Sequence, residues 1–134
     1  GEAAALLGRP TEEILARPYD ALDAVVERFD RLDIVVVLKA SATILRRSDG
    51  ELRVLDGRCP ALGVAGSGDV LAGIIGAHLA SVYAADDDSR GYDLAVENAL
   101  VEQRLRGRRA AAAYGFFGAG RIAGGAPPAQ ERSE

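Results

Sequence analysis

Apolar residues recur at helical spacing in two long stretches of the chain. Between Tyr19 and Leu32, spacings of three and four residues connect Leu22, Val25, Val26, Phe29 and Leu32. A second stripe follows Val70 and contains Leu71, Ile74, Ile75, His78, Leu79 and Val82. Because such a stripe marks the buried face of an amphipathic helix, both stretches are predicted to be helical. A further helix is predicted from Leu94 to about Tyr114, where four consecutive alanines favour helix formation.

Two shorter helices are predicted ahead of Tyr19. The first covers Glu2 to Leu7 and is stopped by a glycine and a proline that follow it. Thr11 is expected to cap the second helix, whose first turn carries two glutamates near the exposed amides. Pro18 is expected to end this second helix.

A strand pattern separates these helical stretches. Ile34 to Leu38 is an unbroken apolar run, mostly β-branched, which predicts a strand covered on both faces. Thr43 to Arg46 and Glu51 to Leu55 are predicted to pair as a hairpin through Ser48-Asp49-Gly50. Loops are expected at Asp56 to Gly66 and at Asp86 to Arg90. Strands followed by long helices predict an α/β layer fold, and three strands suggest part of a larger domain.

Composition narrows the classes of protein that fit. The chain has 134 residues, of which 49% are hydrophobic and 27% charged, as expected for one folded domain. Its longest uncharged run, Val70 to Ala85, is shorter than the roughly 20 residues that cross a membrane, so no membrane role is expected. A net charge of -4 argues against general nucleic-acid binding. A single cysteine, Cys59, rules out an internal disulfide, and a cytoplasmic location is expected.

The stretch Gly66-Ser67-Gly68-Asp69 carries the strongest chemical signal. Glycines allow unusual backbone conformations, and the free amides at the start of the following helix favour an anion. Asp69 allows two interpretations. It could be a stabilising residue of the first helical turn, or a general base that faces a substrate hydroxyl while a divalent cation offsets the charge.

Four other features of the sequence could carry function. Lys39, the only lysine, ends the predicted strand, where it could bind a ligand or simply be solvated. His78 is interpreted as a half-buried helix residue, and Cys59 as a small apolar residue. Arg104, Arg106, Arg108 and Arg109 are interpreted as a solvated face, with Arg106 turned away from Arg104 and Arg108.

Four segments together resemble a known family. The string from Gly66 to Gly73, Gly-Ser-Gly-Asp-Val-Leu-Ala-Gly, resembles the anion-hole signature of the ribokinase-like superfamily, closest to the ADP/ATP-dependent NAD(P)H-hydrate dehydratases. Gly1 to Leu7 resembles the family's Gly-Glu-X-X-Arg-Leu-Leu segment, and Val37 to Ile44 resembles its Leu-Lys-Gly-X-X-Thr nucleotide segment. Cys59-Pro60-Ala61-Leu62 is similar to its Asn-Pro-X-Leu approach to the anion hole.

This resemblance covers the C-terminal half of the family's domain. It implies that residues 1–123 are part of a ribokinase-like layered α/β/α nucleotide-binding domain, with residues 124–134 as a flexible tail. It also implies that the chain pairs with itself or with an N-terminal half that precedes Gly1. Three positions depart from the family pattern: Ala5 replaces a common arginine, Ala40 a usual glycine, and Arg106 the histidine of Leu-His-Gly.

The resemblance further implies a lyase that restores NADH or NADPH from their hydrates, with Mg²⁺ and ADP or ATP. Nucleotide contacts would come from Lys39, Ala40, Ser41, Ala42, Thr43 and Gly68. Gly66, Ser67 and Gly68 would form the anion hole, Asp69 would act as general base and contact the hydrated nicotinamide dinucleotide, and no residue would form a protein metal site. Two alternatives stay open: a ribokinase-like kinase of a sugar or vitamin precursor, and a catalytically silent interaction module.

Overall fold

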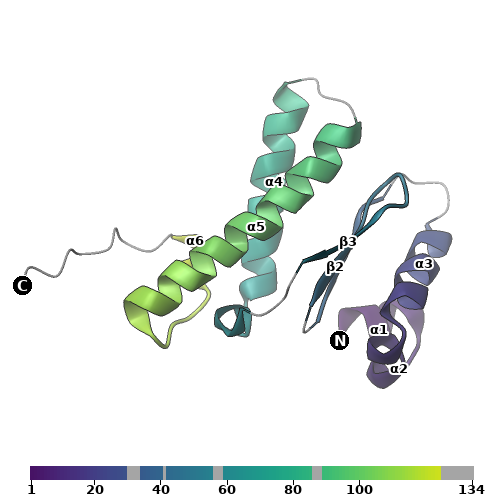
Figure 1. Cartoon of the computed structure of the whole chain (residues 1–134), viewed down its shortest axis with the longest axis horizontal. Helices are drawn as coiled ribbons and strands as arrows, with labels where there is room; N and C mark the ends of the chain where they lie inside the picture. Colours follow the sequence, from purple (N-terminus) through teal and green to yellow (C-terminus); the bar gives the residue numbers. More distant parts are fainter. Residues whose placement is uncertain (30–33, 41, 56–58, 86–88, 125–134) are drawn as a thin grey trace, which may run out of the picture. The chain divides into compact units, whose positions relative to one another are not determined.

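The computed structural model describes residues 1–29, 34–40, 42–55, 59–85 and 89–124. The chain divides into two compact units, Gly1–Arg58 and Cys59–Glu134, coloured purple to blue and teal to yellow in Figure 1. Together they hold helices and strands, so the predicted α/β class is confirmed. Among the described residues, no helix combines the length and the apolar character that crossing a bilayer demands.

Three helices begin the first unit: α1 (Glu2–Leu7), α2 (Thr11–Ala16) and α3 (Pro18–Arg28). All three were predicted, but the expected capping by Thr11 is wrong. Pro10, in an extended conformation, precedes α2, and Thr11 is its first helical residue. The Thr11 hydroxyl instead accepts a hydrogen bond from the Gly1 ammonium at 3.2 Å. Pro18 opens α3, where its fixed φ and missing N–H suit the first turn.

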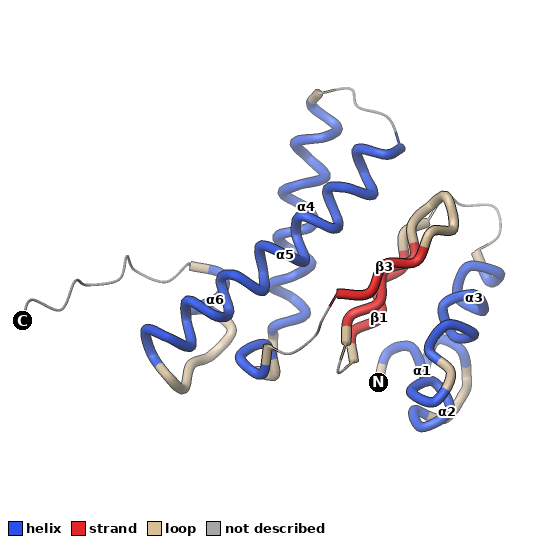
Figure 2. Tube along the Cα trace, in the orientation of Figure 1, coloured by secondary structure: helices blue, strands red, loops and turns tan. Residues whose placement is uncertain are grey.

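The sheet of this unit is antiparallel, with the order β1-β2-β3 (Figure 2). Its strands are β1 (Val36–Lys39), β2 (Thr43–Arg46) and β3 (Leu52–Leu55), and the predicted hairpin joins β2 to β3. The Asp49 carboxylate accepts a hydrogen bond from the Glu51 amide at 2.8 Å, which fixes the predicted turn. This bond accounts for the polar residues between the two strands.

The expected position and environment of the first strand need correction. The strand begins at Val36, two residues later than predicted, and ends at the exposed Lys39. It lies at an edge of the three described strands, so its apolar residues are half-buried rather than covered on both faces. β2 takes the middle position, and its Ile44 and Leu45 are buried. Leu32, predicted within the preceding helix, lies outside the described residues.

The second unit consists of helices. A 3₁₀ turn, η1 (Pro60–Leu62), precedes α4 (Ser67–Ala84), and α5 (Ser89–Tyr114) packs along α4, as Figures 1 and 2 show. A short helix, α6 (Gly120–Ala123), completes the unit. The buried side chains come from all three of these helices and include Leu71, Ile74, Val96, Leu100 and Ile122.

Both long helices were predicted, but α5 begins earlier than expected. Ser89 and Arg90 belong to its first turn, so the predicted loop at Asp86 to Arg90 is wrong at its end. Neither residue is apolar, so the pattern of a buried helix face does not reach them. The helix extends through them because it continues into a well-packed segment. Residues 56–58 and 86–88 of the expected loops, and 125–134 of the expected tail, lie outside the described residues.

Candidate functional site

The start of α4 lies where the glycine-rich string predicts a helix start. Gly66 has a left-handed φ of 82° and immediately precedes the first helical residue, Ser67. A Cβ atom at Gly66 would also lie 3.3 Å from the Cβ of Ala119. Glycine is therefore required here both for the backbone conformation and for the close approach of the residue that precedes α6.

Two amides at this helix start are available to a ligand. The Ser67 amide donates to the Val64 carbonyl at 3.1 Å, and the Val70 amide donates to the Gly66 carbonyl at 3.2 Å. Within the described part of the chain, the amides of Gly68 and Asp69 have no acceptor. Both residues are exposed in their unit, and a Cβ at Gly68 would meet no atom within 4 Å. These amides and the positive end of the helix dipole can bind an anion.

A side chain of α5 forms a hydrogen bond to the backbone of Ser67. Its carbonyl accepts a hydrogen bond from the Gln103 side-chain amide at 2.5 Å, and Gln103 is only 1% exposed. A buried polar contact of this kind fixes the position of the helix start because breaking it would leave two unsatisfied groups. Sequence reasoning missed Gln103. Its signal was a polar residue in register with the buried positions Val96, Ala99 and Leu100.

The segment that leads to α4 packs closely on α5. A Cβ at Gly107 would lie 2.6 Å from the Cδ2 atom of Leu62, so a glycine lets the Leu62 side chain of η1 pack directly on α5. Cys59 is buried, and its thiol lies 3.9 Å from the Arg104 carbonyl. The interpretation of Cys59 as a small buried residue is confirmed. This packing positions the loop that ends at Gly66.

A cavity of about 610 Å³ extends from Asp69 along α4. Its walls come from α4, α5 and α6, and apolar residues alternate there with polar ones. The polar groups lining it are Asp69, His78, Ser81, Glu102 and Arg106. Concave sites with a few convergent polar groups are typical of ligand binding.

Three of these polar groups form an ionic cluster. The Glu102 carboxylate lies 2.7 Å from Nε2 of His78 and 2.5 Å from a guanidinium nitrogen of Arg106. The hydrogen bond from His78 lowers the pKa of Glu102, burial opposes this, and Arg106 lowers the pKa further. The other guanidinium nitrogen of Arg106 donates to the Ala123 carbonyl at 2.9 Å.

This cluster corrects one sequence interpretation and confirms another. His78 is half-buried on α4, as expected. The predicted solvated arginine face is wrong for Arg104 and Arg106, which are half-buried, whereas Arg108 and Arg109 are exposed. Arg106 turns toward the protein because Glu102, one helical turn earlier, and the Ala123 carbonyl both accept its N–H groups.

Most of the residues expected to contact a nucleotide belong to the first unit, and Gly68 belongs to the second. Lys39 ends β1 and pairs across the strands with Thr43. The Ala40 amide donates to the Ala42 carbonyl at 3.0 Å. These residues therefore lie together where β1 connects to β2. Ser41, also expected at this site, lies outside the described residues. The residues of the expected anion hole and general base belong to the second unit: Gly66, Ser67, Gly68 and Asp69. Each of these two expected sites is therefore formed by residues close together in the sequence.

A left-handed glycine, an open helix start and an aspartate in the first helical turn, carried by an α/β chain, fit the ribokinase-like class that the sequence resembles. The family profile Carb_kinase, described as NAD(P)H-hydrate dehydratase, matches residues 1–122. The chain therefore belongs to this family, and the resemblance drawn from the sequence is confirmed.

Curated relatives agree with this assignment. Over 80 residues, or 60% of this chain, it is 44% identical to the bifunctional NAD(P)H-hydrate repair enzyme Nnr of Thermanaerovibrio acidaminovorans. It is 39% identical over 75 residues, or 56% of its length, to the ADP-dependent (S)-NAD(P)H-hydrate dehydratase of Xanthomonas campestris. These matches span only 15% and 25% of the two relatives. No solved structure matches the chain significantly.

Proposed function

We propose that this chain supplies the anion hole and the general base of an ADP- or ATP-dependent NAD(P)H-hydrate dehydratase. The observation that carries the proposal is the start of α4, where the amides of Gly68 and Asp69 are open and the Asp69 carboxylate lies in the same turn. Family membership supports the substrate class. The name of the Xanthomonas relative supports dependence on ADP.

The proposed reaction uses two features of this helix start. The hydroxyl oxygen of the hydrated nicotinamide ring attacks the terminal phosphoryl group of the nucleotide, while Asp69 accepts the hydroxyl proton. The bond from that phosphorus to the bridging oxygen breaks, and AMP leaves from ADP, or ADP from ATP. The open amides stabilise the negative charge that develops on the phosphoryl oxygens. Phosphate then leaves with the ring oxygen, and loss of a ring proton restores the double bond.

The exposed ammonium of Lys39 is proposed to pair with the nucleotide phosphates, together with the turn from Ala40 to Thr43. Lys39 suits this role because its exposed ammonium is a positive charge beside the turn, and such a charge can pair with phosphate oxygens. Gly68 is proposed to contact the nucleotide through its amide.

Mg²⁺ fits this set of residues only as a partner of the nucleotide. The described residues contain no group of three or more His, Cys, Asp and Glu side chains that could hold a metal ion. Mg²⁺ commonly binds through one or two carboxylates and substrate phosphates, and Asp69 offers one such carboxylate. When bound, the ion would neutralise phosphate charge.

The test is Asp69→Asn in the complete protein that contains this chain. We expect kcat for recovery of NADH from its hydrate to fall by roughly 10²- to 10⁴-fold, because a general base acts on the reaction step. The dissociation constant for ADP or ATP should change by no more than a few-fold. Isothermal titration calorimetry and absorbance at the NADH band provide the two measurements.

Asp20→Asn is the matched control, because Asp20 is an exposed aspartate in the first turn of α3. It should leave kcat unchanged. Release of one free phosphate per NADH recovered separates a dehydratase from a kinase, whose phosphate stays on the product. Full activity of Asp69→Asn would remove Asp69 from the mechanism, and phosphate retained on the product would refute the dehydratase assignment.

A further inference from the structure

We infer that Arg106 is a positioning residue for the anion hole and that it acts through α6. This inference rests on the proposed function for its kinetic part. It starts from a chain of contacts in the second unit that connects the ionic cluster in the cavity to Gly66. None of these contacts involves the Asp69 carboxylate.

The first part of the chain of contacts joins α5 to the end of α6. Arg106 uses one guanidinium nitrogen for Glu102 and the other for the carbonyl of Ala123, the last residue of α6. Glu102 is held in turn by His78 of α4. A guanidinium can bridge a carboxylate and a carbonyl in this way because its donors diverge in one plane. Arg106 therefore fixes the end of α6 relative to both long helices.

The second part joins α6 to the start of α4. Ala119, which directly precedes α6, lies so close to Gly66 that an added Cβ there would be 3.3 Å from its methyl group. Ile122 is fully buried, and the Arg121 guanidinium lies 4.6 Å from the ring centre of Tyr114. α6 thus approaches Gly66 through Ala119, the residue before its start, and binds Arg106 through Ala123, its last residue.

A small displacement of α6 would change the position of the amides in the anion hole. Gly66 sets the direction in which the Gly68 and Asp69 amides point, because its carbonyl accepts the first hydrogen bond of α4, from Val70. Interactions made with a transition state are sensitive to displacements of about 1 Å. Loss of the Arg106 side chain, which binds Glu102 and the Ala123 carbonyl, should therefore reduce kcat more than it changes substrate binding.

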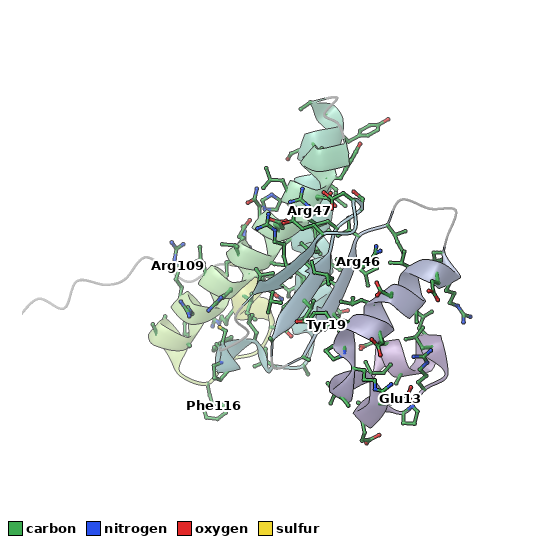
Figure 3. All side chains as sticks on the ribbon, turned by 45° about the vertical axis from the view of Figure 1, so that its right-hand side comes forward. Glu13, Tyr19, Arg46, Arg47, Arg109 and Phe116 are labelled. Atoms are coloured by element: carbon green, nitrogen blue, oxygen red, sulfur yellow. The ribbon has the colours of Figure 1, made fainter. Side chains whose placement is uncertain are left out.

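The first experiment compares Arg106→Ala with Arg109→Ala in the complete protein. Arg109 is an exposed residue of the same helix and projects outward from it in Figure 3. We expect Arg106→Ala to lower kcat for NADH recovery by about 3- to 10-fold, with KM for nucleotide and hydrate held within about twofold. Arg109→Ala should change neither. A rise in KM at unchanged kcat would overturn the inference, since it would show that Arg106 meets the substrate directly through the cavity.

Hydrogen exchange gives a readout that does not depend on activity. In Arg106→Ala, exchange should rise in Gly120–Ala123 and at the Ser67 and Val70 amides, whose acceptors belong to the loop that α6 supports. Exchange elsewhere in α4 should stay unchanged. Unchanged protection at Ser67 and Val70 would overturn the positioning role even if kcat falls. Absence of dehydratase activity in the wild type would instead refute the proposed function and leave this measurement decisive.

A second variant reaches the same contact from the other side. Ala119→Leu places a larger side chain against Gly66 and leaves Glu102 and Arg106 unmutated. We expect the same pattern, a lower kcat at nearly constant KM. The melting temperature of Ala119→Leu is compared with that of Arg109→Ala, which we expect to equal the wild-type value. Wild-type kcat in Ala119→Leu would contradict the inference, because α6 would then not control the anion hole.

Discussion

Two polar side chains of the second unit, His78 and Arg106, share one partner, the carboxylate of Glu102. His78 and Arg106 lie 28 positions apart in the numbering, and only the antiparallel packing of α4 and α5 brings both to Glu102. Helical spacing within α5 predicted that Arg106 turns away from Arg104. It could not predict that Arg106 also donates to the Ala123 carbonyl of α6, or that Glu102 also contacts His78 of α4.

The lowered pKa of Glu102 makes a specific prediction about pH. Its folded-state pKa lies below the ordinary glutamate value of about 4.3, so the carboxylate contributes stability that is complete above that value. This contribution is lost as pH falls through the lower, folded-state pKa. Glu102→Gln should therefore flatten the acid side of a plot of melting temperature against pH.

The matched control for this measurement is Glu12→Gln, which changes an exposed glutamate in the first turn of α2. Its acid profile should follow that of the wild type. Thermal unfolding monitored by circular dichroism between pH 7 and pH 3 supplies the data. Identical acid profiles for Glu102→Gln and the wild type would show that the cluster adds no pH-dependent stability.

Helices and strands were predictable to the extent that their determinants are local. The start of α4 was predicted correctly because a left-handed glycine and an apolar stripe are both encoded within a few residues. The start of β1 at Val36 depends on its pairing with β2, and the helical state of Ser89 depends on the long helix that follows it. A sequence window contains neither of these interactions.

Two neighbouring glycines at the start of α4 should respond in opposite ways to substitution by alanine. Gly66→Ala imposes a left-handed φ of 82° on a residue with a Cβ and crowds Ala119, so stability should fall by about 1–2 kcal/mol. Gly68→Ala fills open space inside a helix and should raise stability by up to about 1 kcal/mol. The same change places a methyl group beside the open amides and should weaken ADP binding.

Urea denaturation and isothermal titration calorimetry measure these two effects separately. Gly76→Ala, also in open space within α4 but two turns further along, is the matched control for Gly68→Ala. It should raise stability without changing ADP affinity. Equal ADP affinity for Gly68→Ala and the wild type would show that the nucleotide does not approach this amide.

The molecule as a whole consists of two units, each with its own buried side chains. Family membership followed from motifs spread over nearly the full chain, which is why sequence alone could identify it. The site within each unit is assembled from neighbouring residues. Contacts such as Gln103 to Ser67 and Ala119 to Gly66 were missed because they join positions far apart in the sequence.

Pairing of the chain with itself or with a further segment stays a prediction. In the first unit, β1 is an edge strand among the described residues, and an apolar cavity of about 610 Å³ lies between α1, α3 and β1. Edge strands and apolar surface both favour association. We expect sedimentation velocity of residues 1–134 to show a species larger than a monomer. A monomer that stays folded over a tenfold range of concentration would contradict this expectation.

The ionic cluster also has a practical consequence, because His78 is the only histidine in the chain. The proton on its Cε1 atom therefore gives a single imidazole resonance in a proton NMR spectrum, without competing imidazole signals from this chain. That ring contacts Glu102 directly and is connected through it to Arg106 and the end of α6. A single resonance thus provides a built-in spectroscopic reporter on the junction of three helices beside the anion hole.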